Sequence, residues 1–407
     1  MKIGILTYHA ACNFGANLQV LSTVSYFINR GYDTYVINYY PDELDKFYYL
    51  NTPFEQYKEH QSFNCSNLPL TRICKTIVEV AEVINEEQID AVIVGSDAVM
   101  QHHPLLSRIV FPCKTIIHVS HLTKDRMCPS PFWGSFIPLL NKTIPVCYMS
   151  ASSQNSSFHQ LSKKEKSLLK LHLNRFAYIS TRDDWTAKMV HYIMDGDLTP
   201  QVTPDPVFAF NYNVKNQFSE EYIRTKFKLK NKYYLVSFHK NSVSKEWLLE
   251  LKNKSKANGI DCIALPFPQG VEFLHPFDYE IGLPLSPLEW YAIIKYSSGY
   301  IGHNMHPIVV SLHNSVPCYS FDNYGIVKWR FFTNEKSSKI YHIMNEFDLL
   351  SSRTKDIGFN RIIPNVDEVI CCLDRFNKSK NSYYADLYLE KYKAMMKNIE
   401  EIINQNL

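Results

Sequence analysis

The feature that most constrains the fold is a short apolar run followed by a polar connection and an amphipathic helix, repeated along the chain. Residues 3–8 are apolar, residues 9–17 read HAACNFGAN, and apolar side chains then recur at helical spacing up to Gly31. A second apolar run, residues 34–39, follows directly. A strand, a helix and a strand joined so closely predict a parallel pair with a right-handed crossover. We therefore expect an α/β protein.

The pattern lapses around residues 211–218 and restarts at residue 233. A chain of 407 residues also exceeds what one hydrophobic core usually serves. We expect two facing Rossmann-like, doubly wound domains, at residues 1–212 and 213–380. A long charged segment, residues 381–407, has helical periodicity, and we expect it to pack back across the domain boundary.

The composition and net charge of the chain indicate which classes of binding partner to expect. The chain is 45% hydrophobic and 20% charged, as globular proteins are, and its net charge of +3 comes from bases scattered among acids. Without a basic stripe we expect no nucleic-acid partner. No stretch approaches the roughly 18 apolar residues that span a bilayer, so at most peripheral membrane contact is expected.

The cysteines and histidines do not have the spacing of a metal site. The 10 cysteines include no Cys-x-x-Cys, and neither they nor the pair His102-His103 match a zinc pattern. We therefore expect no metal and interpret the cysteines as reduced thiols of a cytoplasmic protein.

Polar segments follow the predicted strands. They read YHAACNFGA, GSDAVM, SASSQ, STRDD and PDPVF, and are rich in Asn, Ser, Asp and Arg. In parallel sheets the loops at the carboxyl ends of strands form the ligand site. Two such sheets facing each other predict a polar cleft between the domains.

The segment GHNMHP, residues 302–307, lies between a predicted strand and a predicted helix. His306 would sit in the first helical turn, where exposed amides favour an anion and oppose protonation of a histidine unless that anion is bound. Such a histidine can exchange a proton beside a phosphate or carboxylate. The alternative interpretation is that His303 and His306 are capping or packing residues.

Arg182 and Asp97 also follow predicted strands. A guanidinium offers a planar fork of donors that fits a carboxylate or phosphate. The alternative interpretation is that Arg182 forms a salt bridge with Asp183 or Asp184. Asp97 could accept a hydroxyl proton, or it could cap the following helix.

Taken in order, the motifs resemble the polysaccharide pyruvyl transferase family over residues 1 to about 325. The resemblance rests on KIGILTYHAACNFGANLQVL, GYDTYVINYY, AVIVGSDAVM, PVCYMSAS, ISTRDDWTAKMV, VTPDPVF and LSPLEWYAIIKYSSGYIGHNMHPIVVSLHNSVPCYSF. The family implies two Rossmann-type domains arranged as in GT-B glycosyltransferases. It also implies transfer of a pyruvyl group from phosphoenolpyruvate to a sugar, usually as a cyclic ketal, in bacterial capsular or exopolysaccharide assembly.

Carried over position by position, the family's Ser-x-His-Gly signature falls on residues 304–307. The resemblance implies that His306 is the general acid and base and that Arg182 is a ligand of the donor. Asp97 would orient or deprotonate the acceptor hydroxyl. Further substrate contacts are expected at Asn13, Gly15, Ser96, His303 and Asn304. The chain departs from the family at Asn304, Pro307, Ala98 and Met100, where serine, glycine, glutamine and tryptophan are usual.

The resemblance implies no cofactor beyond phosphoenolpyruvate as co-substrate. The acceptor would be a sugar, either lipid-linked or nucleotide-linked, used at the inner face of the membrane. Two alternatives remain open from the sequence. One is a GT-B glycosyltransferase that uses a sugar nucleotide, and the other is a catalytically silent binding protein of the same fold.

Overall fold

The first sheet of the computed structural model is parallel throughout. The structure describes residues 1–113, 116–120, 122–322, 325–328, 332–354, 356–357 and 360–405. The sheet has the order β2-β1-β3-β6-β7-β8. Its strands are β1 (Lys2–Leu6), β2 (Asp33–Val36), β3 (Ala91–Asp97), β6 (Val146–Ala151), β7 (Tyr178–Thr181) and β8 (Gln201–Val202). Strand β1 pairs with β2 on one side and β3 on the other, so the loops after β1 and β3 diverge at a switch point.

The second sheet repeats this arrangement with the order β11-β10-β9-β12-β13, again parallel. Its strands are β9 (Lys232–Ser237), β10 (Ile260–Ala264), β11 (Tyr279–Glu280), β12 (Gly299–Gly302) and β13 (Cys318–Ser320). Here β9 lies between β10 and β12, so the second switch point falls at the carboxyl ends of β9 and β12.

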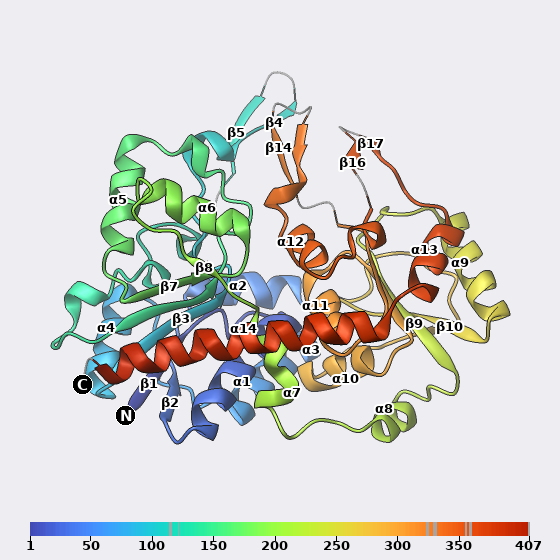
Figure 1. The fold of residues 1–407 in the computed structure, drawn as a ribbon, viewed down its shortest axis with the longest axis horizontal. Coiled ribbons are helices and arrows are strands. Elements are labelled where there is room, and N and C mark those ends of the chain that lie inside the picture. Colours follow the sequence, from blue (N-terminus) through green and yellow to red (C-terminus); the bar gives the residue numbers. More distant parts are fainter. Residues whose placement is uncertain are drawn as a thin grey trace.

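Helices cover both sheets (Figure 1). They are α1 (Phe14–Asn29), α2 (Asp42–Asn51), α3 (Phe54–Asn67), α4 (Ile77–Glu86), α5 (Lys163–Leu173), α6 (Asp184–Ile193), α7 (Phe210–Asn213), α8 (Glu220–Lys226), α9 (Lys245–Ala257), α10 (Pro287–Lys295), α11 (Met305–His313), α12 (Lys339–Glu346) and α13 (Val366–Asp374). One apolar core is continuous between the two halves, and includes Leu18 of α1, Ile293 of α10 and Ile308 of α11. The two sheets are therefore joined by packed helices as well as by the chain.

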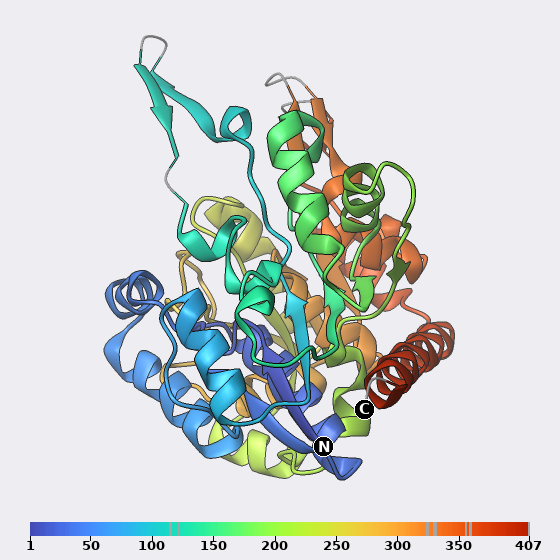
Figure 2. The same ribbon diagram turned by 90° about the vertical axis from the view of Figure 1, so that its left-hand side faces the viewer.

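Helix α14 (Lys378–Gln405) contacts both halves. Near its start, Asn381 donates to the backbone carbonyl of Leu312, 2.6 Å away. Further along, Tyr392 packs edge-on against Tyr26 of α1, with ring centroids 5.9 Å apart. Figure 1 shows the helix crossing in front of both sheets, and Figure 2 shows it along one side of the molecule. The predicted two-domain α/β fold with a terminal helix crossing back is confirmed.

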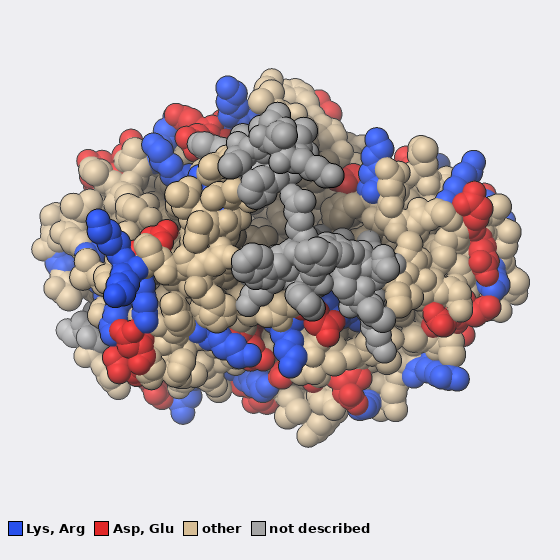
Figure 3. Space-filling model, turned by 90° about the horizontal axis from the view of Figure 1, so that it is seen from above, with Lys and Arg blue, Asp and Glu red and all other residues tan. Residues whose placement is uncertain are grey.

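Among the described residues, three short antiparallel strand pairs stand apart from the two large sheets. They are β4 (Ile109–Cys113) with β5 (Ile116–Val119), β14 (Ile326–Lys328) with β15 (Phe332–Asn334), and β16 (Asp356–Ile357) with β17 (Asn360–Arg361). Acidic and basic side chains are interspersed around the face in Figure 3. In the ranges that the structure describes, no helix has the length and apolarity needed to traverse a bilayer.

Two features differ from the sequence prediction. Helices α2 and α3 fill the connection between the second strand and the next predicted helix, where the sequence indicated no element. Helix α14 begins at Lys378 instead of residue 381, because the Asn377 side chain accepts a hydrogen bond from the Lys380 amide and caps the helix earlier. Both are local details of helix ends and short helices, which periodicity defines poorly.

The contact of α14 with the first domain should contribute measurably to stability. We expect Tyr392→Ala to lower the free energy of unfolding by about 3–5 kcal/mol, because a fully buried ring is replaced by a cavity. The matched control is Tyr383→Ala on the same helix, where the ring is 61% exposed, and a change within about 0.5 kcal/mol is expected. Urea unfolding followed by circular dichroism measures both. Equal effects of the two substitutions would show that α14 is not held by this packing.

Candidate active site

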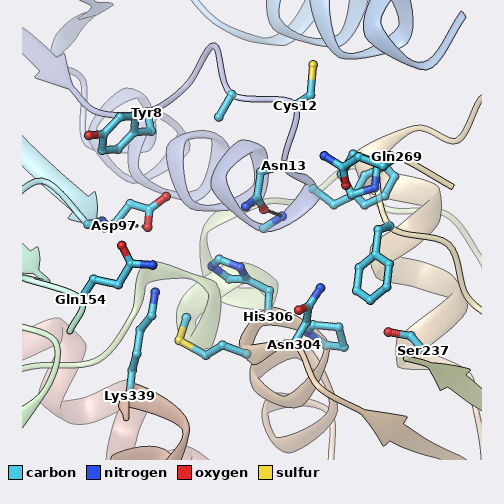
Figure 4. A pocket seen from close by; sticks show the side chains of 18 of the residues that line it. Tyr8, Cys12, Asn13, Asp97, Gln154, Ser237, Gln269, Asn304, His306 and Lys339 are labelled. Carbon is cyan, nitrogen blue, oxygen red and sulfur yellow. Dashed lines mark hydrogen bonds between the residues drawn. The ribbon is translucent and has the colours of Figure 1, made fainter. Parts of the chain in front are cut away.

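A cleft lies where the two switch points face each other. It encloses about 410 Å³ and is lined from both halves of the molecule. Asp97 ends β3 and Gln154 follows β6. Ser237 ends β9 and His306 follows β12. Figure 4 shows these side chains around a common space. The carboxyl-end loops of both sheets therefore enclose one polar cleft.

The starts of helices α1 and α11 meet at this cleft. A Cβ atom built on Gly15 would lie 2.0 Å from Cγ of His306, so the imidazole rests directly against the backbone of α1. Asn13 caps the same helix, with its side-chain oxygen accepting from the amides of Gly15 and Ala16 at 3.0 and 3.3 Å. Both Asn13 and Gly15, predicted as substrate contacts, line the cleft. Gly15 also has a structural role, since it leaves the space that His306 occupies.

His306 is neutral in this environment. Burial lowers the pKa of its imidazole to about 4, although Asp205 and Asp97 act to raise it. Nε2 lies 3.9 Å from Oδ2 of Asp205, too far for a hydrogen bond. This buried nitrogen has no hydrogen-bond partner within the described part of the chain. An anion placed beside the ring would favour its protonation, so His306 is poised to take up a proton when such a ligand binds.

Arg182 lies behind the cleft and not on its surface. It is buried and is not among the residues that line the cavity. Its Nη1 donates to Oδ2 of Asp205 at 2.8 Å, and its Nη2 lies 3.6 Å from Oδ1 of Asp97. Burial opposes its charge, but Asp205 and Asp97 keep its pKa above the ordinary value. The structure thus places Arg182 as a buried counterion of two carboxylates, where the sequence predicted a direct ligand of the donor.

Asp97 faces the cleft and is ionised. Burial acts to raise the pKa of its carboxyl group, yet Arg182 and Lys339 hold the pKa below its usual value. Its Oδ1 accepts a hydrogen bond from the amide of Ala98 at 2.8 Å. A carboxylate in this state can orient an acceptor hydroxyl and receive its proton.

Lys339 is a site residue that sequence reasoning missed. It is the first residue of α12 and lines the cleft, and Figure 4 shows its amine near Gln154. Burial lowers the pKa of this amine to about 8, with a further contribution from Arg182. A helix start with a lysine can bind an anion. The serine cap before it was a usable signal, but the motifs that carried the resemblance ended earlier.

A buried network holds Lys339 in place. The neighbouring Ser338 caps α12, and its hydroxyl donates to Oδ2 of Asp322 at 2.7 Å. Arg353 donates to the same oxygen at 2.9 Å and to Glu335 at 2.8 Å. These groups all belong to the second half of the chain, and they fix the start of α12, where Lys339 lies.

Two further predicted contacts, besides Arg182, lie outside the cleft lining. Ser96 is buried and donates to the backbone carbonyl of Ser150 at 3.1 Å. His303 is buried with its ring edge-on to Phe238, at a centroid distance of 5.3 Å. Both side chains therefore pack in the protein interior. Among the described residues, no group of three or more His, Cys, Asp or Glu side chains is arranged to hold a metal ion.

Three of the positions that depart from the family pattern line the cleft, whereas the fourth, Met100, is buried outside it. The three that line it are Ala98, Asn304 and Pro307. Pro307 is the third residue of α11, within the first turn, where a backbone N–H has no partner in the helix. The proline therefore removes no helical hydrogen bond, and the helix places His306 normally.

Comparison with known protein families identifies the family of this chain. The model of the family described as polysaccharide pyruvyl transferase matches residues 13–324. This range includes the starts of α1 and α11 but ends before Lys339. A search of curated proteins finds no match.

Solved structures show the same architecture at low identity. MnaA of S. aureus in complex with UDP is 12% identical, with 99% of this chain and 96% of that chain covered and a TM-score of 0.50. UDP-GlcNAc 2-epimerase from Neisseria meningitidis bound to UDP-GlcNAc is 10% identical, with 98% and 100% covered and a TM-score of 0.49. At such identities the likeness to the S. aureus structure concerns the fold alone, and it supports the GT-B arrangement of the two domains.

Substituting Gly15 tests the contact between α1 and α11. We expect Gly15→Ala to destabilise the protein by about 1–3 kcal/mol, because the new methyl group would overlap His306. The control is Gly282→Ala, where an added Cβ meets no atom within 4 Å, and a change within about 0.5 kcal/mol is expected. Chemical unfolding measures both variants. If Gly15→Ala were as stable as Gly282→Ala, the imidazole would not rest against α1.

Proposed function

Since the chain belongs to the polysaccharide pyruvyl transferase family, we propose that it moves the pyruvyl group of phosphoenolpyruvate onto a sugar and closes a cyclic ketal. The acceptor is a glycan in the assembly of a bacterial surface polysaccharide, such as a capsule. The observation that most supports this proposal is that His306, Asp97 and Lys339 share one cleft. These groups supply a proton carrier, a carboxylate base and a cation.

The donor carries a phosphate and a carboxylate, and the cleft offers matching positive groups. Lys339 stands at the start of α12, and His306 stands in the first turn of α11, so two helix N-termini face the same space. Arg126 also lines the cleft. Arg182 is buried behind the cleft and does not line it. It acts on the site indirectly, because it pairs with the carboxylates of Asp205 and Asp97.

The chemistry requires that a carbon atom of the donor gains a proton and that each of two sugar hydroxyls loses one. His306, protonated once the anionic donor is bound, gives a proton to the methylene carbon of phosphoenolpyruvate, which becomes a methyl group. The adjacent carbon is then electrophilic, and a sugar hydroxyl adds to it while its proton passes to Asp97 or back to His306. A second hydroxyl adds at the same carbon as the carbon–oxygen bond to phosphate breaks, and its proton leaves with the phosphate. The products are the ketal and inorganic phosphate.

Removing the imidazole tests the acid–base role. We expect His306→Gln to lower pyruvyl transfer by about 10²- to 10⁴-fold while phosphoenolpyruvate still binds, because proton transfer is lost and the cations remain. Mass spectrometry of lipid-linked and free glycans after incubation with phosphoenolpyruvate detects the added pyruvyl group. Calorimetry measures donor binding to the same variant. Unchanged turnover would remove His306 from the mechanism.

Removing the amine tests donor binding. We expect Lys339→Met to weaken phosphoenolpyruvate binding by about 10- to 100-fold, the worth of a charged hydrogen bond. The control is Lys336→Met, an exposed lysine three residues earlier, which should bind normally. Since a protonated amine binds the anion and burial lowers its pKa to about 8, wild-type affinity should fall as pH rises above about 8. The Lys339→Met variant should lose this pH dependence.

Calorimetry of the wild type also separates the proposal from its alternatives. Binding of phosphoenolpyruvate supports the pyruvyl transferase. Binding of UDP-glucose in its place would indicate a glycosyltransferase, and phosphoenolpyruvate binding without transfer to any glycan would indicate a silent protein.

A further inference from the structure

The cleft has a second end, built by the loops that follow β9 and β10. We infer that this end binds an uncharged sugar unit of the acceptor, and that the diphosphate or nucleotide of any carrier lies outside it. The inference rests on the proposed pyruvyl transfer, because it assigns the bound sugar as the acceptor.

Figure 4 shows how the two ends are arranged. Asp97, Gln154 and Lys339 lie on one side, Gln269 and Ser237 lie on the other, and His306 lies between them. A donor held by Lys339 therefore has its reacting carbon on the His306 side. An acceptor that enters from the Gln269 side would present its hydroxyls to the same imidazole.

The two ends differ in charge. Among the residues that line the cleft, the cations Lys339 and Arg126 belong to the donor side. Arg126 follows Asp125, whose carboxylate accepts from the Tyr8 hydroxyl at 2.9 Å, and Tyr8 lies beside Asp97 in Figure 4.

From the loops after β9 and β10, the titratable groups that line the cleft are His239 and Glu272. They pair with each other, with Nδ1 of His239 2.8 Å from Oε2 of Glu272. Because a carboxylate can only accept, Nδ1 carries the hydrogen of this bond. The pair presents no surplus positive charge, so this end does not suit a phosphate or a diphosphate.

The lining chemistry instead suits a pyranose. The imidazole of His239 stacks on Phe267, with centroids 4.7 Å apart and planes at 5°, and forms a flat aromatic surface. The C–H groups of a sugar ring pack on such a surface, while the Gln269 amide, the Ser237 hydroxyl and the Glu272 carboxylate provide donors and acceptors for its hydroxyls. A few polar groups on an apolar floor are typical of small-molecule sites.

Gln269 is held on a tight turn. The amide of Phe267 donates to the Gly270 carbonyl at 3.0 Å, and the Gly270 amide donates back to Phe267 at 2.9 Å. Gly270 has a φ of 111°, which favours glycine. The turn fixes the backbone of Gln269 before any ligand arrives, so little ordering is needed on binding.

The test is direct binding of neutral and anionic probes without turnover. Saturation-transfer NMR is recorded with methyl β-D-galactopyranoside, methyl β-D-glucopyranoside, methyl β-D-mannopyranoside and methyl N-acetyl-β-D-glucosaminide, and separately with uridine diphosphate and inorganic pyrophosphate. Wild type is compared with Gln269→Ala, with His239→Ala, and with the control Lys240→Ala, an exposed neighbour outside the cleft lining. Calorimetry with phosphoenolpyruvate is run on all four proteins.

We expect at least one glycoside to receive saturation from the wild type and from Lys240→Ala. Its signal should fall at least about fivefold in Gln269→Ala or His239→Ala, since each loses part of the site, whereas phosphoenolpyruvate affinity stays within about twofold. The inference is overturned if none of the glycosides binds, if binding is unaffected by both variants, or if these variants abolish binding of uridine diphosphate or pyrophosphate. Failure of phosphoenolpyruvate to bind the wild type would instead overturn the proposed function, and with it the assignment of the sugar as an acceptor.

Discussion

The cleft depends on the contact between the starts of helices α1 and α11. These helices follow strands of different sheets, and they approach closely because Gly15 has no side chain where the imidazole of His306 lies. Next to this contact, Phe14 stacks on Trp290 with ring centroids 5.3 Å apart. The apolar core continues through both helices, so the position of His306 relative to the first sheet is set by packing. The site is thus assembled before a ligand arrives.

The buried charges around the cleft explain the protonation states of its polar groups. Arg182 lies between the carboxylates of Asp205 and Asp97, and burial leaves His306 neutral and lowers the pKa of Lys339. An anionic ligand would reverse both tendencies, because it favours the charged forms of the imidazole and the amine. The cleft therefore suits chemistry in which a proton is taken up together with an anion. The other end of the cleft, where His239 and Glu272 pair and no surplus positive charge is present, lacks this property.

Much of the fold and part of the site could be predicted from the sequence. Strand and helix periodicity gave both sheets and the crossing terminal helix, and the position of residues 302–307 placed His306 at a helix start beside the cleft. The sequence did not predict whether a given polar side chain is buried or faces the cleft. Ser96 precedes Asp97 at the end of β3, and Arg182 directly follows β7, but both side chains are buried in the interior. The position of a residue in the sequence determines which end of the sheet its backbone reaches. The surrounding packing determines whether its side chain faces the cleft or the interior.

The sequence by itself determined the order of strands and helices, the two-domain α/β architecture and the family, because local periodicity and the spacing of motifs are properties of the chain alone. The tertiary structure decided which polar residues meet. Lys339 joins His306 and Asp97 although it lies beyond the matched segment, and Arg182 pairs with Asp205 instead of facing a ligand. The physical reason is that these groups come from separate loops and elements. The distances between these groups and their protonation states depend on how the two sheets pack together. No single segment of the sequence encodes that packing.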